Sequence, residues 1–144
     1  MRHSLIIVFF CLITSGVFAG QKISAGTGDT TLVIVQDDIT SAVASAINAG
    51  DAKKLASYFS PSIDLTLPGT EGTYSKSQAE MIIKDFFTKY PPVSFKINQQ
   101  GSSNEGSQFA VGTMISKAAT FKTYFLIKKR DGFPLLHQLQ FEQE

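Results

Sequence analysis

The residue of this sequence best suited to acid–base chemistry is His137, which lies in an alternating segment near the C-terminal end. An unperturbed imidazole titrates near neutral pH, so a histidine beside a polar ligand can accept or donate a proton there. Alternation places His137 on one strand face with Leu135, Leu139 and Phe141, a face that we expect to point to the core. Two interpretations stay open: a general base or ligand-orienting group in a pocket, or a buried histidine bonded to a backbone carbonyl or a tyrosine. We favour the second, because no second base or nucleophile is paired with it.

The composition argues against several classes of protein. Lysine and arginine number 13 and aspartate and glutamate 12, so the chain lacks the basic excess of a nucleic-acid-binding domain. Two histidines and one cysteine are too few for an ordinary zinc site, and the GxSxG, HExxH, P-loop and EF-hand patterns do not occur. We therefore expect one folded domain with no metal, no cofactor and no nucleic-acid partner.

The N-terminal residues have the pattern of a secretory signal peptide. Arg2 and His3 precede an apolar run over 5–18, and Ala19 supplies the small residue of a cleavage site. The run is shorter than the roughly 20 residues that a membrane-spanning helix needs. The sequence therefore predicts a signal peptide over 1–19 and a periplasmic or extracellular protein, with no stable membrane insertion after cleavage.

After the signal peptide, the residues divide into an arm and a domain. Residues 20–36 are small and polar at their start, so we expect a flexible N-terminal arm. The apolar run 32–35 fits either a strand or the lead-in to a helix, and both stay open. The remaining residues, 37–144, are predicted to form one domain.

Capping residues and helical spacing predict three helices in the first part of the domain. The third carries the strongest local signal, because a capping box precedes apolar residues at helical spacing. The predicted helices run from Asp37 or Asp38 to Gly50, from Asp51 to Ser60-Pro61, and from the capping box 75–78 to Tyr90-Pro91-Pro92.

Alternating apolar residues predict strands in the rest of the domain. One short strand lies between the second and third helices, and four consecutive strands follow the third helix. Short polar turns, among them Asp131-Gly132, favour an antiparallel meander. One apolar sheet face needs cover, so the expected fold class is α+β, with three N-terminal helices packed on a curved antiparallel sheet. The predicted strands are 63–67, 93–97, 109–115, 121–127 and 135–141.

Four stretches of the sequence resemble a family of small exported bacterial proteins, mostly from Bacteroidetes and of unknown function. These stretches are residues 46–65, 72–92, 94–103 and 137–142. The resemblance spans residues 37–142 and implies a nuclear-transport-factor-2-like cone, the fold shared with SnoaL-type cyclases and ketosteroid isomerase. It implies no activity, because this fold carries enzymes, adaptors and binding modules alike.

Within such a cone, isomerase-type chemistry needs a carboxylate base and hydrogen-bond donors, one of them a tyrosine. Tyr58 and Tyr74 are the candidate donors and, with His137, the candidate ligand-binding residues. Asp64 has the opposite parity to its apolar neighbours, so we expect it to point to solvent or to a turn amide. Glu71 lies in a glycine-containing loop and is expected to be solvated.

The helix-free face of the sheet is a candidate surface for a homodimer. Tyr124 shares a strand face with two lysines and Leu126, and in this fold that surface often pairs two protomers. Met114 and Leu136 are further candidate contacts. The alternative is a set of scattered exposed apolar atoms, which are normal on any surface.

Phenylalanine is abundant, with 12 residues, and seven of these are predicted to face the core. They either fill the cone or line an apolar pocket with His137 as its polar group, and we favour the filled cone. The seven are Phe86, Phe87, Phe95, Phe109, Phe121, Phe125 and Phe141.

Taken together, these patterns favour a non-enzymatic exported module. It is expected to bind a small apolar ligand or a protein partner, and to dimerise through its sheet. The alternative is a SnoaL-like isomerase, cyclase or dehydratase that uses His137 with Tyr58 or Tyr74 in the cone pocket.

Overall fold

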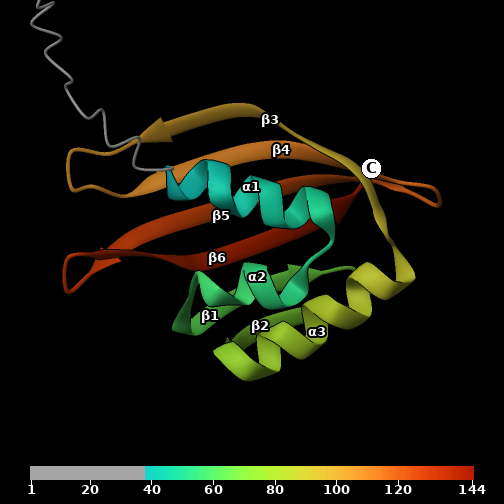
Figure 1. Cartoon of the computed structure of the whole chain (residues 1–144), viewed down its shortest axis with the longest axis horizontal. Coiled ribbons are helices and arrows are strands. Elements are labelled where there is room, and N and C mark those ends of the chain that lie inside the picture. Colours follow the sequence, from blue (N-terminus) through green and yellow to red (C-terminus); the bar gives the residue numbers. More distant parts are fainter. Residues whose placement is uncertain (1–37) are drawn as a thin grey trace, which may run out of the picture. The chain divides into compact units, whose positions relative to one another are not determined.

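The computed structural model describes residues 38–144 (Figure 1). The predicted signal peptide over 1–19, the arm over 20–36 and the run 32–35 lie outside the described residues. In the described part, all three helices lie on one side of a curved sheet (Figure 1). None of these helices is long and apolar enough to cross a membrane.

Side-chain caps define the first two helices, α1 (Ile39–Ala49) and α2 (Ala52–Ser57). Asp38 caps α1 by accepting a hydrogen bond from the backbone N–H of Thr40. Gly50 ends α1 with φ 65°, a left-handed conformation that glycine adopts without a steric penalty. Asp51 then accepts from the N–H of Lys54 at 2.8 Å and starts α2 after a single-residue turn.

The third helix, α3 (Lys76–Lys89), begins at the predicted capping box. Ser75 Oγ accepts from the N–H of Gln78, and the Gln78 side chain accepts from the N–H of Ser75. This reciprocal pair satisfies two backbone donors that the helix itself leaves free. Ala79, Ile83 and two phenylalanines form the buried side of α3.

The sheet has six strands in the order β2-β1-β6-β5-β4-β3. Neighbouring strands are antiparallel except β1 and β6, which pair in parallel, so the expectation of a wholly antiparallel sheet is wrong at this pair. No tight hairpin joins β1 to β6, because β2, α3 and the strands β3 to β5 lie between them in the sequence, and so nothing imposes opposite directions. The strands are β1 (Phe59–Leu67), β2 (Thr70–Ser75), β3 (Pro92–Ser102), β4 (Gln108–Ser116), β5 (Thr120–Arg130) and β6 (Phe133–Gln143).

Two features at the start of the sheet differ from the sequence-based prediction. The second helix ends earlier than expected, and Phe59 and Pro61 belong to β1 instead. Residues 70–75 form β2, an edge strand that was not predicted because its residues are mostly polar and lack apolar alternation. Glu71, expected in a loop, therefore lies in β2, and it is exposed as expected.

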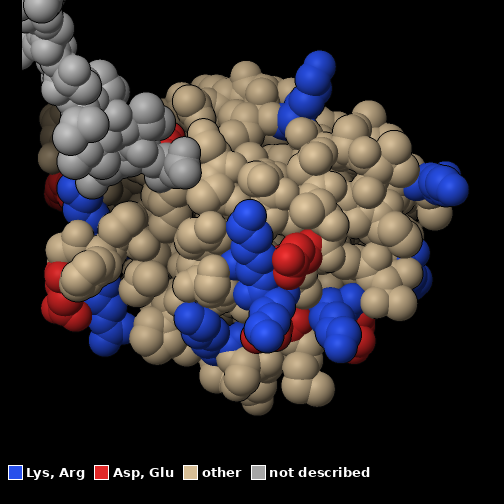
Figure 2. Space-filling model, in the orientation of Figure 1, with Lys and Arg blue, Asp and Glu red and all other residues tan. Residues whose placement is uncertain are grey.

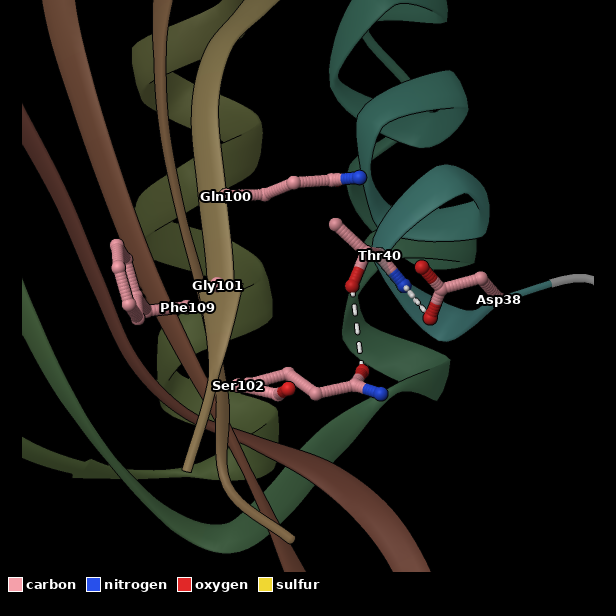
Figure 3. Close-up of a pocket in the computed structure, with 7 residues that line it drawn as sticks. Asp38, Thr40, Gln100, Gly101, Ser102 and Phe109 are labelled. Carbon is pink, nitrogen blue, oxygen red and sulfur yellow. Dashed lines mark hydrogen bonds between the residues drawn. The ribbon is translucent and has the colours of Figure 1, made fainter. Parts of the chain in front are cut away.

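The core face of β4 is the opposite of the predicted one. Ala110 and Met114 are fully buried, whereas Phe109 is only half-buried and points away from α1 (Figure 3). The prediction that Phe109 faces the core is therefore wrong. The physical reason is space: the core-side position Gly112 lies under the ring of Phe95, which leaves no room for a large side chain there.

Aromatic rings from α3, β5 and β6 fill the space between helices and sheet. The ring centroid of Phe86 lies 5.1 Å from that of Phe121 and 4.9 Å from that of Phe141. Tyr90 adds a further ring 4.9 Å from Phe121. This packing matches the filled-cone alternative, since rings in contact at these distances leave little space between them.

Candidate functional site

His137 lies at a β-bulge in β6. On β5, Leu126 pairs with Gln138 and the next residue, Ile127, pairs with Leu136, so His137 is the extra residue. The bulge reverses the expected alternation: Leu136 is buried with the core, and His137 moves to the opposite face. The prediction that His137 shares the core face of Leu139 is therefore wrong, because one inserted residue changes which side a strand position faces.

A second irregularity lies directly beside the first. β1 pairs with β6 at Phe59 and Leu136 and then again at Asp64 and Gln138, with four residues of β1 between these pairs but only His137 on β6. The β1 segment over 60–63 is therefore out of regular register beside His137. Two bulged strands at one place leave a depression instead of a continuous pleated surface.

The depression, which we call the His137 hollow, has a volume of about 300 Å³. Its walls are mostly polar, and three charged side chains lie in them, two basic and one acidic. The hollow lies on the sheet face that carries no helix, since Leu126, Lys128 and Gln138 alternate with buried core residues. Its lining residues are Ser60, Ser62, Asp64, Leu126, Lys128, Arg130, His137 and Gln138.

Burial holds the pKa of His137 below its ordinary value of 6.5, and the positive charges of Lys128 and Arg130 lower it further. Asp64 acts in the opposite direction without reversing the shift. The ring is therefore mainly neutral at pH 7. Its Nε2 atom is enclosed and has no hydrogen-bond partner among the described residues, so an internal hydrogen bond to a carbonyl or a tyrosine does not hold this nitrogen.

The structure does not bring His137, Tyr58 and Tyr74 together. Both tyrosines are half-buried and pack against the hydrophobic core, and neither lines the His137 hollow. Of the three candidates only His137 lines the hollow, together with Asp64, which was expected to face solvent. Asp64 is exposed and points away from the core as expected, and its Oδ1 accepts a hydrogen bond from Thr73 Oγ1 at 2.6 Å.

Several residues of the hollow were not predicted as site residues. Lys128 and Arg130 were not named as site residues, and Ser60 was assigned to a helix end. The charged pair at alternate positions, two residues apart on one strand, was a usable signal. The bulge that brings His137 beside them has no mark in the sequence that we recognise.

The open face of the sheet carries a second group of side chains. Phe109 pairs with Leu126 and Val111 with Tyr124 across β4 and β5, and all four are half-buried. A hollow of about 280 Å³ lies at Val111, Tyr124 and Gln140. Tyr124 thus lies where it was predicted, on the face without helices.

Met114 and Leu136, the other predicted dimer contacts, do not lie on the open face. Both are fully buried in the core. Their assignment to the open face is wrong for two reasons. The parity of β4 is inverted around Gly112, and the bulge at His137 reverses the faces of β6.

Two other hollows lie on the helix side. One, of about 260 Å³, lies between the start of α1 and the end of β3 (Figure 3). Its polar groups are engaged with one another: Thr40 Oγ1 donates to Gln108 Oε1 at 3.3 Å, and Asp38 caps α1 (Figure 3). The other, of about 500 Å³, lies between the α1–α2 turn and α3, where charges of both signs alternate (Figure 2). Neither arrangement gathers groups for a reaction, and residues 38–144 hold no cluster of three or more metal-ligating side chains.

Comparison with known proteins gives a consistent picture of relatives. The family model described as "Domain of unknown function (DUF4783)" matches residues 40–142. A solved protein of this family from Bacteroides ovatus is 27% identical, with a TM-score of 0.68, over 72% of this chain and 93% of its own. Another, from Bacteroides uniformis, is 23% identical, with a TM-score of 0.71, over 74% of this chain and 98% of its own.

More distant solved structures share the fold alone. A putative calcium/calmodulin-dependent protein kinase II association domain from Xanthomonas campestris is 19% identical, with a TM-score of 0.56, over 74% of this chain and 83% of its own. Proteins described as nuclear-transport-factor-2-like and of unknown function also match, one of them from Cytophaga hutchinsonii. No curated protein matches the chain.

Proposed function

The chain belongs to the DUF4783 family, a family of unknown function with a nuclear-transport-factor-2-like fold, and we propose that it is an exported association module. Its partner surface is the open face of the sheet, and its first partner is a second copy of the same chain. The observation that carries this proposal is an apolar group of four side chains on that face, Phe109, Val111, Tyr124 and Leu126.

The group is continuous across two strands. Phe109 and Val111 on β4 lie opposite Leu126 and Tyr124 on β5, so four apolar side chains form two adjacent cross-strand pairs. Gln140 of β6 lies beside Tyr124 in the same row. Tyrosine and phenylalanine surrounded by uncharged polar groups are typical of the centre of a protein interface.

Charges lie at the edge of this group. Lys122 pairs with Glu142 across β5 and β6 at one end, and Lys128 lies at the other end. A two-fold axis through the group would bring the same patch of both copies together, which is how most homodimers form. Opposite charges at the edge then fix the orientation of the two copies.

The filled interior argues against a small apolar ligand inside the cone. Phe86, Phe121 and Phe141 occupy the space that such a ligand would need. The open face is therefore the better supported binding surface.

The isomerase, cyclase or dehydratase alternative finds less support. Such an enzyme needs a base and a donor that converge on one substrate atom. His137 lines a hollow on the open face, whereas Tyr58 and Tyr74 pack against the core. The structural similarity to the Xanthomonas campestris protein, which is described as a putative association domain, supports an associating role for this fold.

The test is the mass of the processed protein in solution. The chain, exported with its own leader from a Bacteroides strain and purified, is measured by sedimentation equilibrium between about 5 and 200 μM. We expect a dimer, and we expect Tyr124→Glu and Val111→Lys to give monomers that melt within a few degrees of the parent. Met81→Glu is the matched control, because Met81 is 68% exposed on α3, away from the sheet face. A monomeric parent at 200 μM, or a dimer that tolerates both substitutions, would contradict the proposal.

A further inference from the structure

We propose that the His137 hollow binds a small hydroxylated oxyanion, which is a carboxylate or a phosphate monoester on a skeleton that carries hydroxyl groups. The site adjoins the association surface, because Leu126 and Lys128 belong to both, and it goes beyond the proposed function.

The hollow is built by two coincident irregularities of the sheet. β6 bulges at His137, and β1 leaves regular register over 60–63. A single bulge re-aims one side chain, whereas two on adjacent strands also withdraw the backbone and open a depression. Ser60, near the start of β1, is almost fully buried and still lines this depression. The polar lining of the hollow therefore continues below the surface of the sheet.

The charges that face the hollow favour an anion. Lys128 and Arg130 come from β5 and Asp64 from β1, which leaves one positive charge in excess. Arginine presents a planar set of donors that matches a carboxylate or a phosphate, and lysine adds a point charge beside it. Asp64 keeps its negative charge, and its Oδ1 is already engaged as an acceptor of the Thr73 hydroxyl.

The remaining polar groups match hydroxyls. Ser62 and Gln138 both line the hollow and can donate or accept hydrogen bonds. Asp64 Oδ2 can accept a hydrogen bond from a ligand hydroxyl. Leu126 supplies an apolar surface for a carbon skeleton. A bare anion would leave these groups unused, and for that reason the inferred ligand carries hydroxyls.

His137 links occupancy of the hollow to a measurable signal. Its pKa is lowered by burial and by Lys128 and Arg130, whereas a bound anion would raise it. Binding and protonation therefore favour each other, and the affinity for a carboxylate, which stays fully ionised over this range, should increase as the pH falls from 7.5 to 6. The charged groups that face the ring are the same two cations and Asp64.

The experiment is a nuclear magnetic resonance titration of the His137 imidazole in the processed protein. The probes are D-gluconate, D-glucose 6-phosphate and inorganic phosphate, with sorbitol as the uncharged control. We expect a saturable shift with gluconate or glucose 6-phosphate, at least about tenfold weaker in the double variant Lys128→Gln/Arg130→Gln. A stronger response to gluconate assigns the site to carboxylates, and a stronger response to glucose 6-phosphate assigns it to phosphate monoesters.

The matched control is Lys96→Gln, a charge removal at an exposed position of β3 that lines neither the hollow nor the association surface. It should bind the probe as the parent does. No saturable shift with any of the three anions, equal binding by the double variant, or an equal response to sorbitol would overturn the inference. Repeating the titration with Tyr124→Glu separates the two proposals, because the association surface is altered there and the hollow is intact.

Discussion

Gly112 of β4 and Phe95 of β3 are in such close contact that no side chain fits between them. A Cβ atom on Gly112 would lie 2.7 Å from Cζ of Phe95 and 2.5 Å from the carbonyl oxygen of Lys96. Contacts below 3.0 Å to backbone atoms require the strands to move apart. This one relationship explains why Phe109 and Val111 of β4 lie on the open face, with Gly112 on the core side.

The first prediction follows from that contact. Gly112→Ala should lower the free energy of unfolding by about 1–3 kcal/mol, because overpacking displaces backbone as well as the Phe95 ring. Gly101→Ala is the matched control: its Cβ would meet only the ring of Phe109, 2.7 Å away on the open face, and that half-buried ring can rotate. We expect Gly101→Ala to cost less than about 1 kcal/mol. Urea unfolding of both variants measures the difference, and equal costs would contradict this account of β4.

The second prediction concerns the bulge in β6. Deleting His137 leaves Leu136, Gln138 and Leu139 in regular alternation, so the core residues keep their face and the protein should fold. Deleting Gln140 has the opposite effect, because it turns Phe141 from the core to the open face. Circular dichroism and thermal melting should show a folded protein in the first case and loss of cooperative folding in the second. If deletion of His137 also abolished folding, the bulge would be a structural necessity.

Gly112 and His137 mark the two strands whose faces could not be predicted from the sequence alone. Local signals were sufficient for the caps at Asp51 and Ser75, which depend on hydrogen bonds within one turn. They were also sufficient for the turn at Asp131-Gly132, where both residues have positive φ. The faces of β4 and β6 depend instead on contacts with other strands, and alternation within one strand cannot reveal an inserted residue.

The candidate site, too, could be predicted from the sequence only in part. Residue type identified His137, and parity placed Asp64 outside the core. The presence of Ser60, Arg130 and His137 in one hollow depends on the parallel pairing of β1 with β6. That pairing joins segments more than 70 residues apart, and only the folded sheet shows it.

The third prediction is a pH dependence of stability that comes from His137. Its pKa in the folded protein is lowered, first by burial and then by Lys128 and Arg130, so the unfolded chain binds a proton more readily. Stability should therefore fall as the pH decreases through 6.5, the ordinary value, and should not change from this source above about pH 7.5. Urea unfolding at pH 7.5 and pH 5.5 gives the difference for the parent and for His137→Gln. The variant should lose a smaller part of its stability on acidification, and an equal or larger loss would show that other groups dominate.

The fourth prediction tests whether the cone is filled. Phe86 contacts Phe121 and Phe141 with ring centroids 5.1 and 4.9 Å apart, and it is almost fully buried. Phe86→Ala should therefore lower the free energy of unfolding by about 3–5 kcal/mol, and Met81→Ala on the exposed side of α3 should stay within about 0.5 kcal/mol of the parent. If the interior is closed around the ring, the variant gains an apolar cavity, and saturating benzene should raise its melting temperature but not that of the parent. Stabilisation of the parent by benzene would instead reveal a cavity already present in the cone, and the apolar-ligand alternative would regain its support.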